Sequence, residues 1–140
     1  GADGAEELYI GTSGKDLATL DPDTGKMKTI ATLPSAGPEF AGNAGGELWG
    51  FFPRVSPARV RRIDPKTGKI LVTHNLTKFS QPWAGSYAFA MYKNVFYIFY
   101  SSSYGSSSSV YRLTKAGALT TWMGSTGINI VGAGVSTCAN

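Results

Sequence analysis

Apolar residues in this chain gather in short runs rather than in a helical pattern. Aromatic and β-branched residues dominate residues 8–11, 48–52 and 96–100, and runs of this length and composition are typical of strands. No window of ten residues keeps apolar side chains at positions i, i+3, i+4 and i+7, the spacing of an amphipathic helix. The pattern therefore predicts an all-β protein made of many short strands.

One turn motif occurs twice in the sequence. Asp-Pro-x-Thr-Gly-Lys occupies residues 21–26 and 64–69, and a shorter version occupies residues 114–117. Proline presets φ, the aspartate side chain accepts a backbone N–H two residues on, and glycine takes the left-handed position. The motif predicts a hairpin between the last two strands of a repeated unit. Apolar pairs precede all three turns: Leu17 and Leu20, Val60 and Ile63, Val110 and Leu113.

The repeated unit holds four short strands and recurs about every 43 to 50 residues. A repeat of this period with four strands per unit is typical of a β-propeller. We place the three repeats at about residues 8–47, 48–95 and 96–136, within one domain that spans residues 1–140. Apolar runs without strict alternation fit this fold, because neighbouring blades cover both faces of each sheet.

The pattern "LWGFF…RVRRIDPKTGK" resembles the blades of six-bladed propellers of the NHL, SMP-30 and quinoprotein-like types. The resemblance covers nearly the whole chain and implies a blade architecture, not a chemistry. It is nearest to bacterial extracytoplasmic propellers without an assigned activity, which favours an extracytoplasmic location.

Three blades cannot close a ring, since known propellers have about four to eight. Counting strands from the axis outward, the chain begins on a second strand, and residues 128–135 provide a final innermost strand. A homodimer would then close a six-bladed ring, with residues 128–135 pairing with residues 8–12 of the second copy. The alternative is that the chain is half of a longer polypeptide.

Charge is divided unevenly along the chain. All nine carboxylates lie between Asp3 and Asp64, and residues 65–140 carry six Lys and Arg without an acid. The basic half could meet an anionic glycan, or the acidic half of a second copy; nucleic acid is the less favoured partner. No apolar run approaches the roughly 20 residues that span a bilayer. Cys138 is the one cysteine, so no disulfide forms within the chain.

Catalytic and metal-binding patterns are weak. The turn at Asp21 lacks the closing Glu of a calcium loop, because Thr32 stands eleven positions on. His74 is the only histidine, too few for a zinc site or a catalytic triad. We therefore expect no enzyme activity, no cofactor and no metal. Near the axis, Glu39, Asn43 and Asn129 are the polar residues expected on innermost strands.

Two further groups of side chains are candidates for binding. Arg54, Arg59, Arg61 and Arg62 form the densest basic cluster, which reads either as an anion site or as a solvated strand edge. Trp83 lies in a loop before an innermost strand and could stack on a sugar. The candidate ligand-binding residues are Trp83, Arg54, Arg61, Asn43 and Asn129.

The sequence favours a non-catalytic binding or scaffold module, with a glycan or a protein as its ligand. Two alternatives stay open: a carbohydrate-binding, lectin-like propeller, and a metal-dependent hydrolase of the lactonase type.

Overall fold

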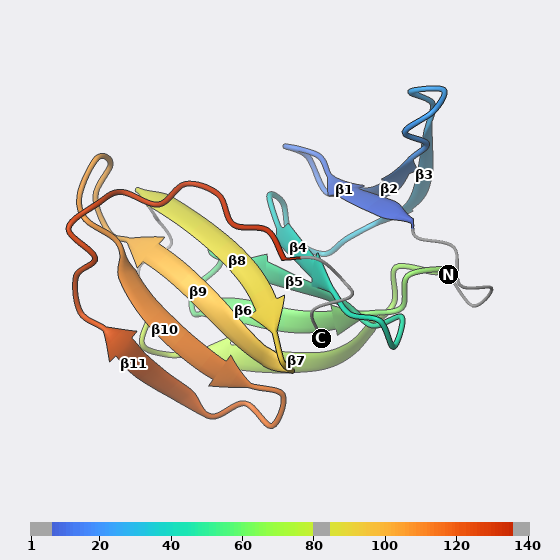
Figure 1. The fold of residues 1–140 in the computed structure, drawn as a ribbon. Coiled ribbons are helices and arrows are strands. Elements are labelled where there is room, and N and C mark those ends of the chain that lie inside the picture. The colour runs from blue at the N-terminus through green and yellow to red at the C-terminus, as the bar shows by residue number, and fades with distance from the viewer. Residues whose placement is uncertain (1–6, 80–84, 136–140) are drawn as a thin grey trace.

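The computed structural model describes residues 7–79 and 85–135, which form three antiparallel sheets (Figure 1). The first sheet has the strand order β1 (Leu8–Gly11), β2 (Asp16–Leu20), β3 (Met27–Thr32). The second has the order β4 (Glu39–Gly42), β5 (Leu48–Phe52), β6 (Ala58–Ile63), β7 (Ile70–Leu76). The third has the order β8 (Ser86–Tyr92), β9 (Val95–Ser101), β10 (Ser109–Thr114), β11 (Leu119–Met123). Consecutive strands pair within each sheet, as in propeller blades.

The repeated turns have the predicted geometry. The Asp21 carboxylate accepts the backbone N–H groups of Asp23 and Thr24 at 2.9 and 3.1 Å. Asp64 accepts those of Lys66 and Thr67 at 2.8 and 3.2 Å. A hydrogen bond from the Thr24 side chain, with these backbone bonds, holds the pKa of Asp21 below its ordinary value, and the Lys66 backbone bond does so most strongly for Asp64. The two hairpins therefore form by the same local chemistry in the first and second sheets.

The larger core lies between the second and third sheets. Its centre is aromatic, with the Phe51 and Phe89 ring centroids 5.9 Å apart and those of Trp49 and Phe96 4.8 Å apart. Its buried members are Trp49, Phe51, Ala58, Val60, Leu76, Phe79, Phe89, Met91, Phe96, Ile98, Tyr100 and Leu113.

A smaller core lies between the first and second sheets, where Leu17 and Leu33 pack with Leu48, Phe52 and Ile63. Side chains of a strand alternate between its two faces, so the second sheet contributes to both cores. Every residue of β5 is consequently buried. This arrangement explains the apolar run without alternation at residues 48–52.

The segment that follows β11 does not form the expected twelfth strand. Residues 124–135 carry no strand and run beside the third sheet toward β4 (Figure 1). Buried Ser108 holds the segment: its N–H donates to Ile128 O at 2.8 Å, its carbonyl accepts Thr126 N–H at 2.9 Å, and its Oγ accepts Ile130 N–H at 2.9 Å. These bonds come from a single residue and do not form a ladder of strand pairing, so the segment lies beside the sheet without joining it.

Among the described residues, no helix has the length and apolar character needed to cross a membrane.

Candidate functional site at the inner strands

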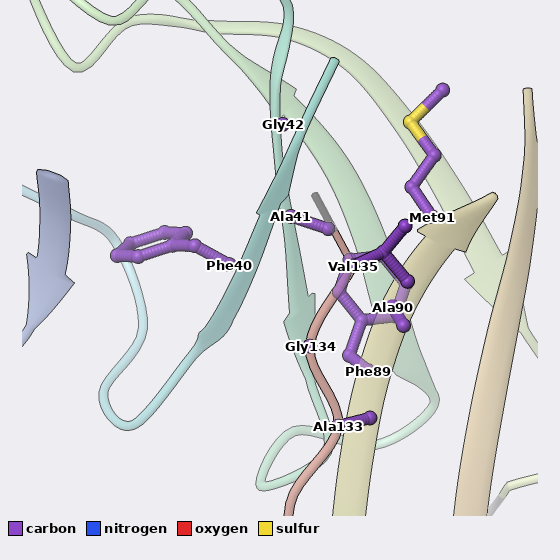
Figure 2. Close-up of a pocket in the computed structure, with 9 residues that line it drawn as sticks. All are labelled: Phe40, Ala41, Gly42, Phe89, Ala90, Met91, Ala133, Gly134 and Val135. Atoms are coloured by element: carbon purple, nitrogen blue, oxygen red, sulfur yellow. The ribbon is translucent and has the colours of Figure 1, made fainter. Parts of the chain in front are cut away.

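The first strands of the second and third sheets, β4 and β8, contact one another. Each lies at the edge of its sheet, and residues 133–135 pass between them, as Figure 2 shows. Together they enclose a cavity of about 150 Å³, lined by Phe40, Ala41, Gly42, Phe89, Ala90, Met91, Ala133, Gly134 and Val135. Ligand pockets usually measure about 300–1,000 Å³. The cavity of a single chain therefore suits a side chain better than a metabolite.

Glu39 is the carboxyl group within strands β4 and β8. It begins β4 and is partly buried. Burial raises its pKa to about 7, although a hydrogen bond from the Phe89 backbone N–H opposes the shift. Phe89 belongs to β8, so this carboxylate joins the inner strands of two sheets. Sequence reasoning placed Glu39 near the axis, but its buried environment could not be read from the pattern.

Arg54 lies beside the loop that leads into β4. A side chain at Gly37 would come within 3.6 Å of Arg54 Cδ and Nε, and within 3.7 Å of Tyr87 Oη. Tyr87 donates its hydroxyl to Gly37 O at 3.3 Å. Arg54 itself is exposed, so its guanidinium remains a candidate for anion binding at this end of β8.

Arg61 was predicted to be accessible for binding, but the structure buries its side chain. It is 5% exposed, and its Nη1 donates to Ser35 Oγ at 3.1 Å. The guanidinium lies 4.9 Å from the centre of the Phe52 ring. Burial, helped by nearby Arg59, lowers its pKa. Arg61 therefore packs between the first and second sheets, and it does not lie on a solvated strand edge.

The arginine cluster is divided by strand alternation. Arg59 and Arg61 share one face of β6 and Arg62 takes the other, as predicted. Arg62 Nη2 lies 3.5 Å from Glu47 Oε1 on the side of the third sheet. The four arginines therefore do not form one anion site.

The two candidate asparagines bond within the chain. Asn43 Nδ2 donates to Glu47 Oε2 at 2.8 Å, and Asn43 Oδ1 accepts Glu47 N–H at 3.1 Å. Asn43 and Asn94 also line an open hollow between the β4–β5 and β8–β9 turns. Asn129 accepts a hydrogen bond from Ser86 Oγ, which helps to hold the tail beside β8. Trp83 lies outside the described residues.

His74 and the other metal-ligating side chains are dispersed. Within residues 7–79 and 85–135, no three His, Cys, Asp or Glu side chains form a group that could hold a metal. His74 stacks on Trp49 with ring centroids 5.9 Å apart, and its Nε2 lies 3.1 Å from Lys115 O. The histidine therefore belongs to the contact between the second and third sheets.

Comparisons with known proteins show the fold. No family model matches the sequence, and no curated protein matches it. Among solved structures, the chain is similar to selenomethionine-substituted virginiamycin B lyase from Staphylococcus aureus, with a TM-score of 0.54 and 14% identity. The match covers 94% of this chain and 46% of that chain, so this chain spans about half its length. At this identity the likeness extends to the fold alone: the protein is all-β, with three sheets arranged like propeller blades.

Proposed function

We propose that the chain is a non-catalytic binding or scaffold module that completes a six-bladed propeller by pairing with a second copy of itself. The observation that carries this proposal is a correspondence between covered and uncovered sheet faces. Several large side chains on the two outermost faces are more exposed than the side chains at matching positions between neighbouring sheets.

The outer face of the first sheet shows this correspondence clearly. Leu8 pairs with Leu20 across β1 and β2, as Leu48 pairs with Ile63 across β5 and β6. Leu48 and Ile63 are 4% and 0% exposed because the first sheet covers them, whereas Leu8 is 49% exposed. Met27, on the same face as Leu20, is also exposed. This face therefore has the character of a blade contact that lacks its neighbour.

The outer face of the third sheet is the complementary case. Tyr97 pairs with Arg112 across β9 and β10, as Trp49 pairs with Arg62 in the second sheet. Trp49 is buried against the third sheet, while Tyr97 and Phe99 are only partly buried. Trp122 is 58% exposed, and the Arg112 guanidinium lies 4.3 Å from the centre of its ring. An aromatic face of this kind suits contact with the aliphatic face of a first sheet.

The ends of the chain support the same arrangement. β1 has β2 as its one strand partner among the described residues, so it offers an edge for a further strand. Residues 128–135, which Ser108 and Ser86 hold beside the third sheet in the single chain, would exchange to provide that strand to the second copy, which would give each first sheet four strands. The shared axial surface, with Glu39 from each copy, would then serve as the binding site.

The enzyme activity in the name of the similar lyase structure does not enter this proposal. A shared fold hosts many unrelated functions, and function has to be argued from a site. Within the part of the chain that the structure describes, no group of side chains could hold a metal, so no observation favours a hydrolytic site of the lactonase type. The lectin-like alternative depends on Trp83, which lies outside the described residues, so it is left to experiment.

Size-exclusion chromatography with light scattering tests the proposal. We expect a single species at twice the 14.8 kDa chain mass, stable on dilution into the low micromolar range. A folded, monodisperse species at the mass of one chain would overturn it. Titration of the dimer with a glycan library separates the lectin-like alternative, which predicts saturable binding that is lost in Trp83→Ala.

A further inference from the structure

The repeated turns differ in what surrounds their glycines. A Cβ at Gly68 would come within 2.4 Å of Ala31 in β3, and one at Gly117 within 2.7 Å of His74 in β7. Each of these turns therefore sits against the outermost strand of the preceding sheet. A Cβ at Gly25 in the first turn would meet no atom within 4 Å. The turn at residues 21–26 has the same form as the turn at residues 64–69, but no neighbouring sheet of the described chain packs against it.

The contact between the second and third sheets contains a charge pair at the same place. Lys115 lies in the turn after β10 and bonds to Glu47, in the turn between β4 and β5. Burial alone would raise the pKa of Glu47, but Lys115, Asn43 and Arg62 outweigh it and lower the pKa. We call the turn between the first two strands of a sheet its first turn, and the turn between the last two strands its last turn. The pair shows that the first turn of the second sheet meets the last turn of the third sheet, which follows it along the chain.

Applying this relation to the outermost faces brings two other turns together. The first turn of the third sheet is Lys93-Asn94, between β8 and β9. The last turn of the first sheet is 21–26, with Asp23 at its exposed tip. In this pair of turns the first turn carries a positive charge, Lys93, and the last turn a negative one, Asp23. The contact between the second and third sheets has the opposite arrangement, with Glu47 in the first turn and Lys115 in the last.

We propose that Asp23 of one copy lies against Lys93 of the other in both contacts of the dimer, and that this reversed pair specifies which faces join. The inference rests on the proposed homodimer and names its recognition contact. A wrong pairing of the outermost faces would bring like charges to the same contact: Asp23 of both copies if two first sheets met, or Lys93 of both copies if two third sheets met. Such juxtaposition disfavours wrong partners more than a correct pair adds affinity.

Charge exchange at the two positions tests the inference. In Asp23→Lys both contacts of the dimer hold two lysines, and in Lys93→Glu both hold two acids. Each variant alone should dimerise about tenfold more weakly at low salt, as expected for two exposed pairs that turn repulsive, and high salt should reduce the loss. Asp23→Lys is compatible with the turn, because Lys66 occupies the matching position in the second turn.

Mixing the two variants provides the decisive measurement. A heterodimer of Asp23→Lys with Lys93→Glu has one lysine and one acid in each contact. Native mass spectrometry of an equimolar mixture, with a mass tag on one chain, should show mainly heterodimer, rather than the statistical half. Lys66→Asp is the matched control: it makes the same kind of exchange in an internal turn, and its dimer should match the unaltered protein.

The outcomes separate the two proposals. If the unaltered protein is a monomer, the proposed homodimer and this contact are both wrong. If it is a dimer while the variants dimerise equally well and mix statistically, the homodimer stands and the Asp23–Lys93 contact is wrong.

Discussion

The two contacts between neighbouring sheets differ in size and in chemistry. The second and third sheets meet through a core dominated by aromatic rings, with Phe51, Phe89 and Phe96 fully buried. The first and second sheets meet through a smaller cluster whose buried members are four aliphatic residues and one phenylalanine, and which lies beside a buried arginine. Because burial of apolar area provides most of the stabilisation, the first sheet should be the less firmly held part of the chain.

Phe89→Ala should have the largest effect on stability. The ring lies 5.9 Å from that of Phe51 and 5.5 Å from that of Phe96, and its removal leaves a cavity between large neighbours. We expect a loss of about 3–5 kcal/mol in the free energy of unfolding, measured by urea denaturation. A loss below about 1 kcal/mol would mean that the aromatic core is not where the stability lies.

Leu17→Ala tests the smaller contact. Leu17 is 0% exposed in β2, and its loss should cost about 2 kcal/mol, at the lower end for leucine, since the small cluster can partly collapse. Hydrogen exchange should show faster opening of the first sheet, with the second and third sheets unchanged. Equal acceleration in all three sheets would contradict the unequal division of stability.

Glu39 gives the smallest expected effect, and a defined pH window. Its pKa is raised from 4.5 to about 7 in the folded protein, so the folded state binds the proton more tightly than the unfolded state. Stability should therefore fall as pH rises between these values, by on the order of 1 kcal/mol once the partial exposure of the carboxyl is allowed for. Glu39→Gln should flatten the profile.

A matched variant controls for general pH effects. Glu47 has its pKa lowered, so its contribution is lost as pH falls, the opposite sign. Glu47→Gln should therefore leave the decrease above pH 4.5 in place. If both variants flatten that decrease equally, its source is not Glu39.

Local chemistry made much of the fold readable from the sequence. The turn residues Asp21 and Asp64 act on their own backbone within three positions, so the motif alone predicted two hairpins. The strand-length runs likewise predicted β1, β5 and β9. The sequence did not show which sheet covers each face of a given sheet, because this depends on how the sheets pack together in space.

Arg61 and Glu39 show this limit for the candidate site. Both were noticed in the sequence, but burial assigned them different roles: Arg61 packs on Phe52 and Ser35, while Glu39 joins β4 to β8. Alternation placed Arg61 on a face of β6 but could not say that the first sheet covers that face. The expected strand at residues 128–135 is absent for a related reason, since its backbone bonds go to Ser108 and not along a strand edge.

The two outermost faces differ from one another, which has a consequence for assembly. The proposed pairing joins the aliphatic face of one copy to the aromatic face of the next, so every added copy presents a fresh face of each kind. Such head-to-tail contacts form rings when the rotation between copies closes, and helical filaments when it does not. The angle between successive sheets, set by the size of the side chains between them, would thus decide between a finite particle and a fibre.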